Sequence, residues 1–309
     1  MTRKGWLLFI LMSVLWGIPY LFIRIAVREL DPVVVVFVRL ALAAAILLPV
    51  AAQRKVLGEM RKYWLLLAGL SLIQLVTPFL LISYGELHIT SSLTSLLIAA
   101  EPLLVALFAL RLDPGERVNG LRFVGLLIGM LGVIILLGFD TGGDSQRLLG
   151  AAFVLLATMC YAFSALLIKR PPIAALSSLS VSTTQCVSAT IVLLPLAVTR
   201  LPSHMPSLEV IVSLILLGTI CTALAYLAFF MLLGEVGASR GTVFTYVNPA
   251  VSVLLGVLLL NEPFGFATVA GFLLIILGSW LSTGGALPSR KRLRTRFQQR
   301  LSRGAETSR

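Results

Sequence analysis

The stretch "GELHITSSLTSLLIAAEPLLVALFAL" (residues 85–110) decides the fold, because "LGEVGASRGTVFTYVNPAVSVLLGVL" (residues 233–258) repeats it. Within the two stretches, Glu101–Pro102 aligns with Asn248–Pro249 at an offset of 147 residues. A single pair of apolar segments can look alike by chance. The neighbouring stretches therefore have to be compared in the same way.

The sequence on either side of this pair repeats at nearly the same offset, between 145 and 147 residues. The matching stretches are "GWLLFILMSVLWGIPYLFIR" (5–24) with "GAAFVLLATMCYAFSALLIK" (150–169), "FVGLLIGMLGVIILL" (123–137) with "VAGFLLIILGSWLS" (269–282), and the turns "GERV" (115–118) with "NEPF" (261–264). A near-constant offset over half the chain indicates one unit written twice.

The composition requires a lipid environment. Of the 309 residues, 58% are hydrophobic and 12% are charged, and the mean hydropathy is +1.00, whereas soluble domains have about 45–50% apolar and about 25% charged residues. This excludes a soluble enzyme, a β-barrel with its alternating pattern, and a large catalytic domain outside the membrane. It also disfavours a nucleic-acid-binding protein, despite a net charge of +12.

Ten apolar runs are long enough to be membrane helices. We place them at residues 6–26, 32–52, 63–84, 92–111, 121–138, 149–168, 176–198, 208–232, 240–260 and 265–284. Since each copy of the unit holds five helices, the second copy enters the membrane from the opposite face. Inverted repeats of this kind are typical of secondary transporters.

The prediction is an all-α polytopic membrane protein of ten transmembrane helices in two inverted five-helix repeats. The repeats span residues 1–140 and 141–285, and a basic tail follows at 286–309. The first apolar run also resembles a signal peptide. It is interpreted as a permanent span, because it is long and lacks a small-residue cleavage site.

The basic residues orient the bundle. Of the 25 Lys and Arg residues, 20 fall on the side of the two termini, four on the opposite side, and one, Arg39, inside a span. By the positive-inside rule both termini are cytoplasmic. The expected location is the cell (inner) membrane.

Two prolines in the middle of spans mark places where the backbone departs from a regular helix. Pro102 and Pro249 cannot donate a backbone hydrogen bond, which frees the carbonyls of Ile98 and Thr245. In lipid, a freed carbonyl is tolerated only where protein or a wet cavity provides another partner. The kinks indicate either a gate that faces the substrate or a structural bend packed against neighbouring helices.

Glu101 is the acid placed well inside a span. An exposed charge there costs at least about 2.5–3.5 kcal/mol on insertion scales, so we expect its side chain to face the bundle interior. It either exchanges a proton during transport, pairs with a cationic substrate, or serves helix packing. Arg39 either extends toward the membrane surface or pairs with an internal carboxylate.

The chain resembles the EamA group of ten-helix permeases in the drug/metabolite transporter superfamily. The motifs that carry the resemblance are "LWG" (15–17), "FVRLALAA" (37–44), "EPLLVALFALRLDPGER" (101–117) and "NPAVSVLLGVLLLNEP" (248–263). The resemblance implies a transporter working by alternating access, with export of a small metabolite, amino-acid-like solute or drug, and proton coupling as the driving mechanism. Relatives often have Glu-Pro in both halves, whereas here Asn248 replaces the second glutamate.

Polar and aromatic residues recur on the helices where the resemblance places the central cavity. The predicted cavity and coupling residues are Glu101, Asn248, Trp16, Tyr20, Gln74, Thr77, Thr222, Tyr226 and Thr245. Hydroxyl residues also hold membrane helices together, so each residue alone fits either packing or lining. As a set they suit a small amphipathic organic solute better than an inorganic ion.

The sequence favours a carrier over an enzyme. No Walker-type loop precedes a lysine, and His88 and His204 stand in no HExxH motif, so we predict no catalytic residue, metal site or cofactor. A polytopic membrane enzyme and a non-transporting sensor or scaffold remain the alternatives. The expected partners are a small-molecule substrate and the lipid bilayer, not nucleic acid, with the chain acting as a monomer or homodimer.

Gly125 and Gly129 form a GxxxG pattern that fits either a dimer face or packing within the chain.

Overall fold

The computed structural model describes residues 2–112, 120–138, 145–236 and 243–282, and the predicted tail at 286–309 lies outside them. Seven helical segments are long and apolar enough to cross a membrane, and three shorter apolar helices accompany them: Phe123–Leu137, Asn248–Leu260 and Phe266–Ser282. This part of the chain contains helices and turns but no strand. The all-α polytopic fold is therefore confirmed.

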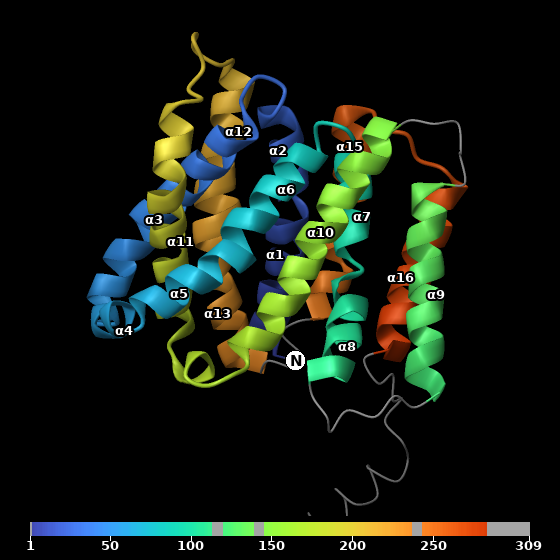
Figure 1. Cartoon of the computed structure of the whole chain (residues 1–309), viewed down its shortest axis with the longest axis horizontal. Coiled ribbons are helices and arrows are strands. Elements are labelled where there is room, and N and C mark those ends of the chain that lie inside the picture. The colour runs from blue at the N-terminus through green and yellow to red at the C-terminus, as the bar shows by residue number, and fades with distance from the viewer. Residues whose placement is uncertain (1, 113–119, 139–144, 237–242, 283–309) are drawn as a thin grey trace, which may run out of the picture.

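The first repeat contains α1 (Arg3–Gly17), α2 (Pro19–Ala26), α3 (Pro32–Gln53), α4 (Leu57–Lys62), α5 (Trp64–Ser71), η1 (Leu72–Val76), α6 (Thr77–Gly85), α7 (Ser91–Ile98), α8 (Glu101–Leu112) and α9 (Gly120–Leu137). The second contains α10 (Ser145–Ile168), η2 (Ile173–Ala175), α11 (Ser178–Val198), α12 (Leu208–Gly218), η3 (Thr219–Leu224), α13 (Ala225–Val236), η4 (Val243–Tyr246), α15 (Asn248–Leu260) and α16 (Phe266–Ser282). In Figure 1, α1 begins and α16 ends at the same end of the bundle.

Short polar side chains begin several of the spans. Thr2 accepts a hydrogen bond from the Gly5 N–H at 3.0 Å, and Asp31 accepts one from the Val33 N–H at 2.8 Å. Ser207 does the same for Val210 at 3.4 Å. Each bond satisfies a backbone N–H of the first helical turn, which has no partner inside the helix.

The spans are less regular than the sequence predicts. The first, expected as one helix over 6–26, is divided after Gly17 into α1 and α2, because Pro19 starts a new helix. The third and the eighth spans each contain a π-helical turn, η1 and η3. The ninth, expected over 240–260, contains the 3₁₀ turn η4 before α15, and residues 240–242 lie outside the described part.

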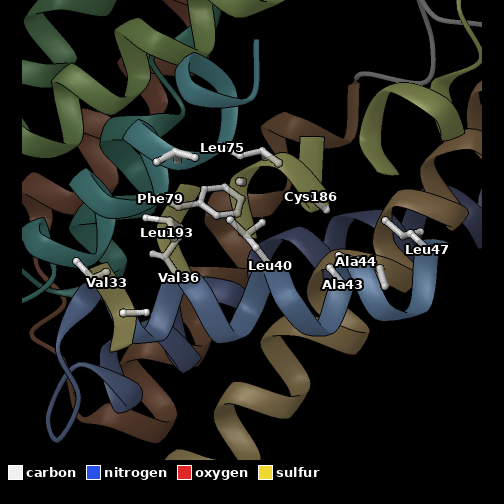
Figure 2. Packing of buried hydrophobic residues seen from close by; sticks show 14 residues of the cluster. Val33, Val36, Leu40, Ala43, Ala44, Leu47, Leu75, Phe79, Cys186 and Leu193 are labelled. Atoms are coloured by element: carbon white, nitrogen blue, oxygen red, sulfur yellow. The ribbon is translucent and has the colours of Figure 1, made fainter. Parts of the chain in front are cut away.

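The largest buried cluster joins the two repeats. Its members come from α3, from η1 and α6, and from α11 and η3, and many of them are drawn in Figure 2. Leu40 and Leu47 of α3 and Leu193 of α11 have no exposed surface. Small residues such as Ala43 and Ala189 let these helices approach closely, which is how helices associate in lipid.

Glycines hold α9 against α16, which lie side by side at one edge of the bundle (Figure 1). A Cβ at Gly132 would lie 2.8 Å from the carbonyl oxygen of Gly271, and one at Gly125 would lie 2.9 Å from that of Gly278. The glycine face of α9 therefore packs within the chain, which is the second of the two roles that the GxxxG pattern left open.

A methyl group at Gly278 should separate α9 from α16, because its Cβ would overlap the backbone of Gly129. We expect Gly278→Ala to lower the free energy of unfolding by about 1–3 kcal/mol, the usual cost of overpacking. Thermal unfolding of the detergent-purified protein measures this. Gly69→Ala is the matched control, since a Cβ at Gly69 meets nothing within 4 Å. Equal melting temperatures for the two variants would contradict the packing role.

Candidate functional site

The two π-helical turns occupy equivalent places in the two repeats. η1 begins at Leu72 and η3 begins at Thr219, an offset of 147 residues, which is the offset of the repeat itself. A π-turn widens the helix and leaves backbone carbonyls without their regular partners, and such turns occur frequently at functional sites. The sequence does not predict these turns, because neither of them contains a proline or a glycine.

Arg39 of α3 points to η3. Its Nε donates a hydrogen bond to Thr222 Oγ1 at 2.9 Å, and Thr222 Oγ1 donates in turn to the Leu217 carbonyl at 2.7 Å. The guanidinium also stacks on the Phe79 ring at 4.0 Å from its centroid. Arg39 is buried and has no carboxylate within ion-pair distance among the described residues. Arg39 therefore fits neither role expected from the sequence, which were extension toward the membrane surface and pairing with an internal carboxylate.

An amide pair mirrors this contact in the other half of the chain. Gln185 of α11 donates from Nε2 to Gln74 Oε1 of η1 at 2.7 Å. Gln185 follows Arg39 by 146 residues, so equivalent positions of the two repeats each contact the π-turn of the other repeat. Both contacts lie at the interface between the repeats. Gln185 was not predicted as a site residue, because the arginine and the glutamine do not align as similar residues.

Three ionisable side chains complete the centre of the bundle. Tyr20 of α2 lies within electrostatic range of Arg39 and Glu101, and Tyr161 of α10 lies within the same range of Arg39, Glu101 and Tyr226. Glu101, the first residue of α8, is half-buried. We define the central polar cluster as Tyr20, Arg39, Gln74, Glu101, Tyr161, Gln185, Thr222 and Tyr226.

Aromatic rings border the central polar cluster between α1 and α13. The Trp16 ring lies edge-on to Tyr226 at 6.2 Å between centroids, and 5.2 Å from Phe229. Phe230 stacks on Tyr226 at 6.3 Å. Two of the predicted cavity residues, Trp16 and Tyr226, are thus in direct contact.

The remaining predicted residues lie elsewhere. Thr77, the first residue of α6, is exposed and forms no hydrogen bond with the central polar cluster in the described part of the chain. Thr245 lies in η4 and Asn248 begins α15, and both are half-buried. The Asn248 carbonyl would lie 2.8 Å from a Cβ at Gly17, which places α15 directly against α1 beside Trp16.

The two prolines divide helices instead of bending them. α7 ends at Ile98, and α8 starts at Glu101 with Pro102 in its first turn. In the second repeat Pro249 stands in the first turn of α15, after the separate 3₁₀ turn η4. Pro is favoured in the first helical turn, because its missing N–H would have no partner there. Glu101 and Asn248 therefore both lie at the start of a half-helix.

A second polar centre, which the sequence analysis did not identify, lies where α7 begins. Glu262 Oε1 accepts hydrogen bonds from the Ser91 N–H at 2.8 Å and the Ser91 hydroxyl at 2.9 Å. Its Oε2 accepts from the N–H and the hydroxyl of Ser92. Glu262 thus joins the second repeat to the start of a helix in the first. From the sequence, "NEPF" (261–264) indicates only a turn that matches "GERV" in the first repeat.

The turn that carries Glu262 follows from its sequence. Asn261 adopts a left-handed conformation with φ of 53° and ends α15, and the Glu262 N–H then donates to the Gly256 carbonyl at 3.1 Å. Asparagine tolerates this conformation, and Pro263 cannot continue the helix. Gly256 leaves room for the carboxylate, because a Cβ there would overlap Glu262 Oε2.

A cavity of about 460 Å³ opens beside this contact. Polar residues that line it include Arg24, His88, Thr90, Ser92, Arg147 and Thr268. Loops nearby are joined across the repeats as well: Arg200 donates to Asp31 at 2.9 Å, which raises the pKa of Arg200, and hydrogen bonds from Ser207 lower the pKa of Glu29. At this end of the bundle, beside the cavity, hydrogen bonds join the two halves.

A model of the EamA-like transporter family matches residues 3–138 and again residues 148–284. The chain belongs to this family. The double match agrees with the repeat deduced from the sequence.

Named relatives are transporters. An "uncharacterized transporter" of Archaeoglobus fulgidus is 28% identical over 90% of this chain and 98% of its own length. A "probable amino-acid metabolite efflux pump" of Escherichia coli K12 is 26% identical over 92% of this chain and 96% of its own length. The "uncharacterized inner membrane transporter YedA" of the same strain is 27% identical over 79% and 78%. A solved crystal structure with 18% identity covers 92% of this chain and 97% of its own, with a TM-score of 0.65, and so shares the fold.

The bond between Arg39 and Thr222 should stabilise the interface between the repeats. We expect Thr222→Val to lower the free energy of unfolding by about 1–2 kcal/mol, because it leaves a buried guanidinium N–H without its acceptor. Thr219→Val is the matched control in the same π-turn, since its hydroxyl donates only to the Ile215 carbonyl of its own helix. Denaturation in mixed detergent micelles compares the two. A loss at Thr222 no larger than that at Thr219 would argue against the role.

Proposed function

We propose that this EamA-family transporter exports a small amphipathic metabolite, an amino-acid-like solute or a drug, by alternating access between two inverted halves. The observation that carries the proposal is the pair of half-helices that start at Glu101 and Asn248, at equivalent places in the two repeats. Discontinuous helices facing each other near the bilayer midplane form substrate sites in several transporter folds. The relative named an amino-acid metabolite efflux pump supports this class of cargo.

The central polar cluster suits such a solute. Hydroxyl, amide and aromatic groups offer hydrogen bonds and apolar surface together, and Arg39 supplies a positive charge. We propose the two domains 1–140 and 141–285, together with the basic tail 286–309, as the working parts of a monomer or homodimer. An alternative function as an enzyme has no specific observation in its favour.

We infer that Glu101 couples transport to protons. Its carboxyl group starts α8 in the bundle interior, within electrostatic range of Tyr20 and Tyr161. An acid in such a place binds and releases protons as its contact with water changes. Because Arg39 carries a fixed charge, the protonation of Glu101 changes the net charge that a substrate meets.

Replacing Glu101 should uncouple flux from the pH gradient. Radiolabelled amino acids and amphipathic metabolites that raise the melting temperature of the purified protein are the probes. In proteoliposomes we expect wild-type flux of such a compound to rise with a proton gradient directed against its movement, and Glu101→Gln flux to be equal with and without the gradient. Glu209→Gln, an exposed carboxylate in the first turn of α12, should behave as wild type.

A gradient response of Glu101→Gln equal to that of the wild type would contradict the coupling role. If neither protein moves any stabilising compound faster than empty liposomes do, the proposed transport function itself is wrong.

The proposed orientation, with both termini in the cytoplasm of the inner membrane, follows from the basic residues. After Cys160, Cys186 and Cys221 are replaced by alanine, Ser203→Cys in the α11–α12 loop should react with a membrane-impermeant maleimide in intact cells. Gln53→Cys, at the end of α3, should react only after lysis. Both positions are exposed. If Gln53→Cys reacts in intact cells and Ser203→Cys reacts only after lysis, the proposed orientation is wrong.

A further inference from the structure

Glu86, directly after α6, is the most unusual acid in the described part of the chain. Its side chain has no exposed surface. Neither Oε1 nor Oε2 has a hydrogen-bond partner among the described residues. A buried carboxylate without partners is very costly, and such a group takes up a proton instead of remaining charged.

Charged and titratable groups face Glu86 from three sides. Arg24 and Tyr20 of α2, Arg39 of α3 and Glu262 of the α15–α16 turn all lie within electrostatic range. Arg24 Nη1 donates to the backbone carbonyl of Glu86, not to its carboxylate. α10 packs on the preceding Gly85 with Gly150, Phe153 and Val154, and its Arg147 lines the adjoining cavity together with Arg24 and His88.

Glu262 has the opposite setting. Four hydrogen bonds from Ser91 and Ser92 converge on its two oxygens at the first turn of α7. N–H and O–H donors and the positive end of a helix stabilise a carboxylate anion. The two neighbouring acids therefore differ in their surroundings: Glu262 is held by four hydrogen bonds at the start of α7, whereas the buried carboxyl group of Glu86 has no partner among the described residues.

A cavity adjoins the residues that bind this pair. The cavity of about 460 Å³ is lined by Ser92, which binds Glu262, and by Arg24, which binds the Glu86 backbone. Neither Glu86 nor Glu262 is among the lining residues, although Pro263, which follows Glu262, is. The contact between Glu262 and α7 therefore lies beside the cavity, while the Glu86 carboxyl group lies buried behind it.

We propose that Glu86 is a second proton-binding acid of this transporter, kept uncharged while Glu262 is bound to α7 and opened to water at this end of the bundle when that contact breaks. The inference rests on the alternating-access function proposed above. When α7 moves away from Glu262, Glu86 releases its proton to water and Arg24 becomes the partner of the new carboxylate. Closing the contact requires Glu86 to take a proton up again.

Infrared difference spectroscopy of the full chain in liposomes tests the protonation directly and needs no substrate. We expect a C=O stretching band of a protonated carboxyl group at neutral pH that Glu86→Gln removes and Glu101→Gln leaves in place. Since Gln resembles the protonated acid, Glu86→Gln should fold and melt as the wild type does. A spectrum of Glu86→Gln that has lost no intensity in this region relative to the wild type would overturn the proposal.

Two further variants keep Glu86 itself and move its titration in opposite directions. Glu262→Gln removes a negative charge that opposes ionisation, so the band should disappear at lower pH than in the wild type. Arg24→Gln removes a positive charge that favours ionisation, so the band should persist to higher pH. A titration that neither variant shifts would overturn the proposal even if Glu86→Gln failed to fold.

The link to opening is tested with a thiol in the cavity. In a background without native cysteines, His88→Cys should react with an impermeant maleimide faster as Glu86 ionises, beyond the reactivity that the thiol gains from pH alone. The same cysteine in a Glu86→Gln background should show only the intrinsic pH profile. Identical profiles in both backgrounds would contradict the gating step.

These measurements distinguish a failure of the proton site from a failure of the proposed transport function. A chain that moves no solute but shows the Glu86 band and its shifts would refute the transport function and keep the proton site. Active, gradient-driven transport without the band would refute the proton site alone.

Discussion

The need to give every backbone polar group a partner inside lipid governs this structure. A regular helix meets the need by itself, whereas a broken one requires help from neighbouring side chains or from water. The described spans depart from regular helices at η1, at η3, between α7 and α8, and between η4 and α15. These four departures form two equivalent pairs, and the central polar cluster lies around them. The division between α1 and α2 has no such counterpart, because α10 is continuous.

The departures also determine which contacts join the repeats. The widened turn η3 presents Thr222 to Arg39, and the widened turn η1 presents Gln74 to Gln185. Arg39 and Gln185 stand at equivalent positions, so the two contacts are related by the same pseudo-twofold axis that relates the repeats. Alternating access by rocking of one half against the other would have to loosen or slide these contacts. They are single hydrogen bonds, and such bonds are worth about 0.6 kcal/mol on average and at most about 1.7 kcal/mol in membranes, which is compatible with such movement.

The sequence predicted the fold well, because each membrane helix corresponds to a long apolar run. The repeat was also predictable, because equivalent residues are separated by a nearly constant offset. It predicted irregular backbone at Pro102 and Pro249, since proline acts on its own backbone, but as bends within a helix and not as the starts of separate helices. It did not predict the π-turns or the roles of Gln185 and Glu262. Those depend on contacts between residues more than 100 positions apart, such as that of Glu262 with Ser91, and no local pattern encodes them. Gln74 lies within the π-turn η1, and Thr77 directly follows that turn. The wider turn places Thr77 on a different face of the span from the one that a regular helix predicts.

The repeats match in their π-turns and half-helices but differ in charge, and the proposed proton coupling depends on this difference. Arg39 and Glu101 lie in the first repeat, and the equivalent positions hold the neutral amides Gln185 and Asn248. If both halves carried the same charges, the two states of a rocking cycle would be chemically alike. With the charges in one half only, the same movement exposes an ionisable acid to a different environment in each state. Since a proton binds according to environment, an asymmetric distribution of charge over a symmetric backbone is the arrangement that can convert a proton gradient into net movement.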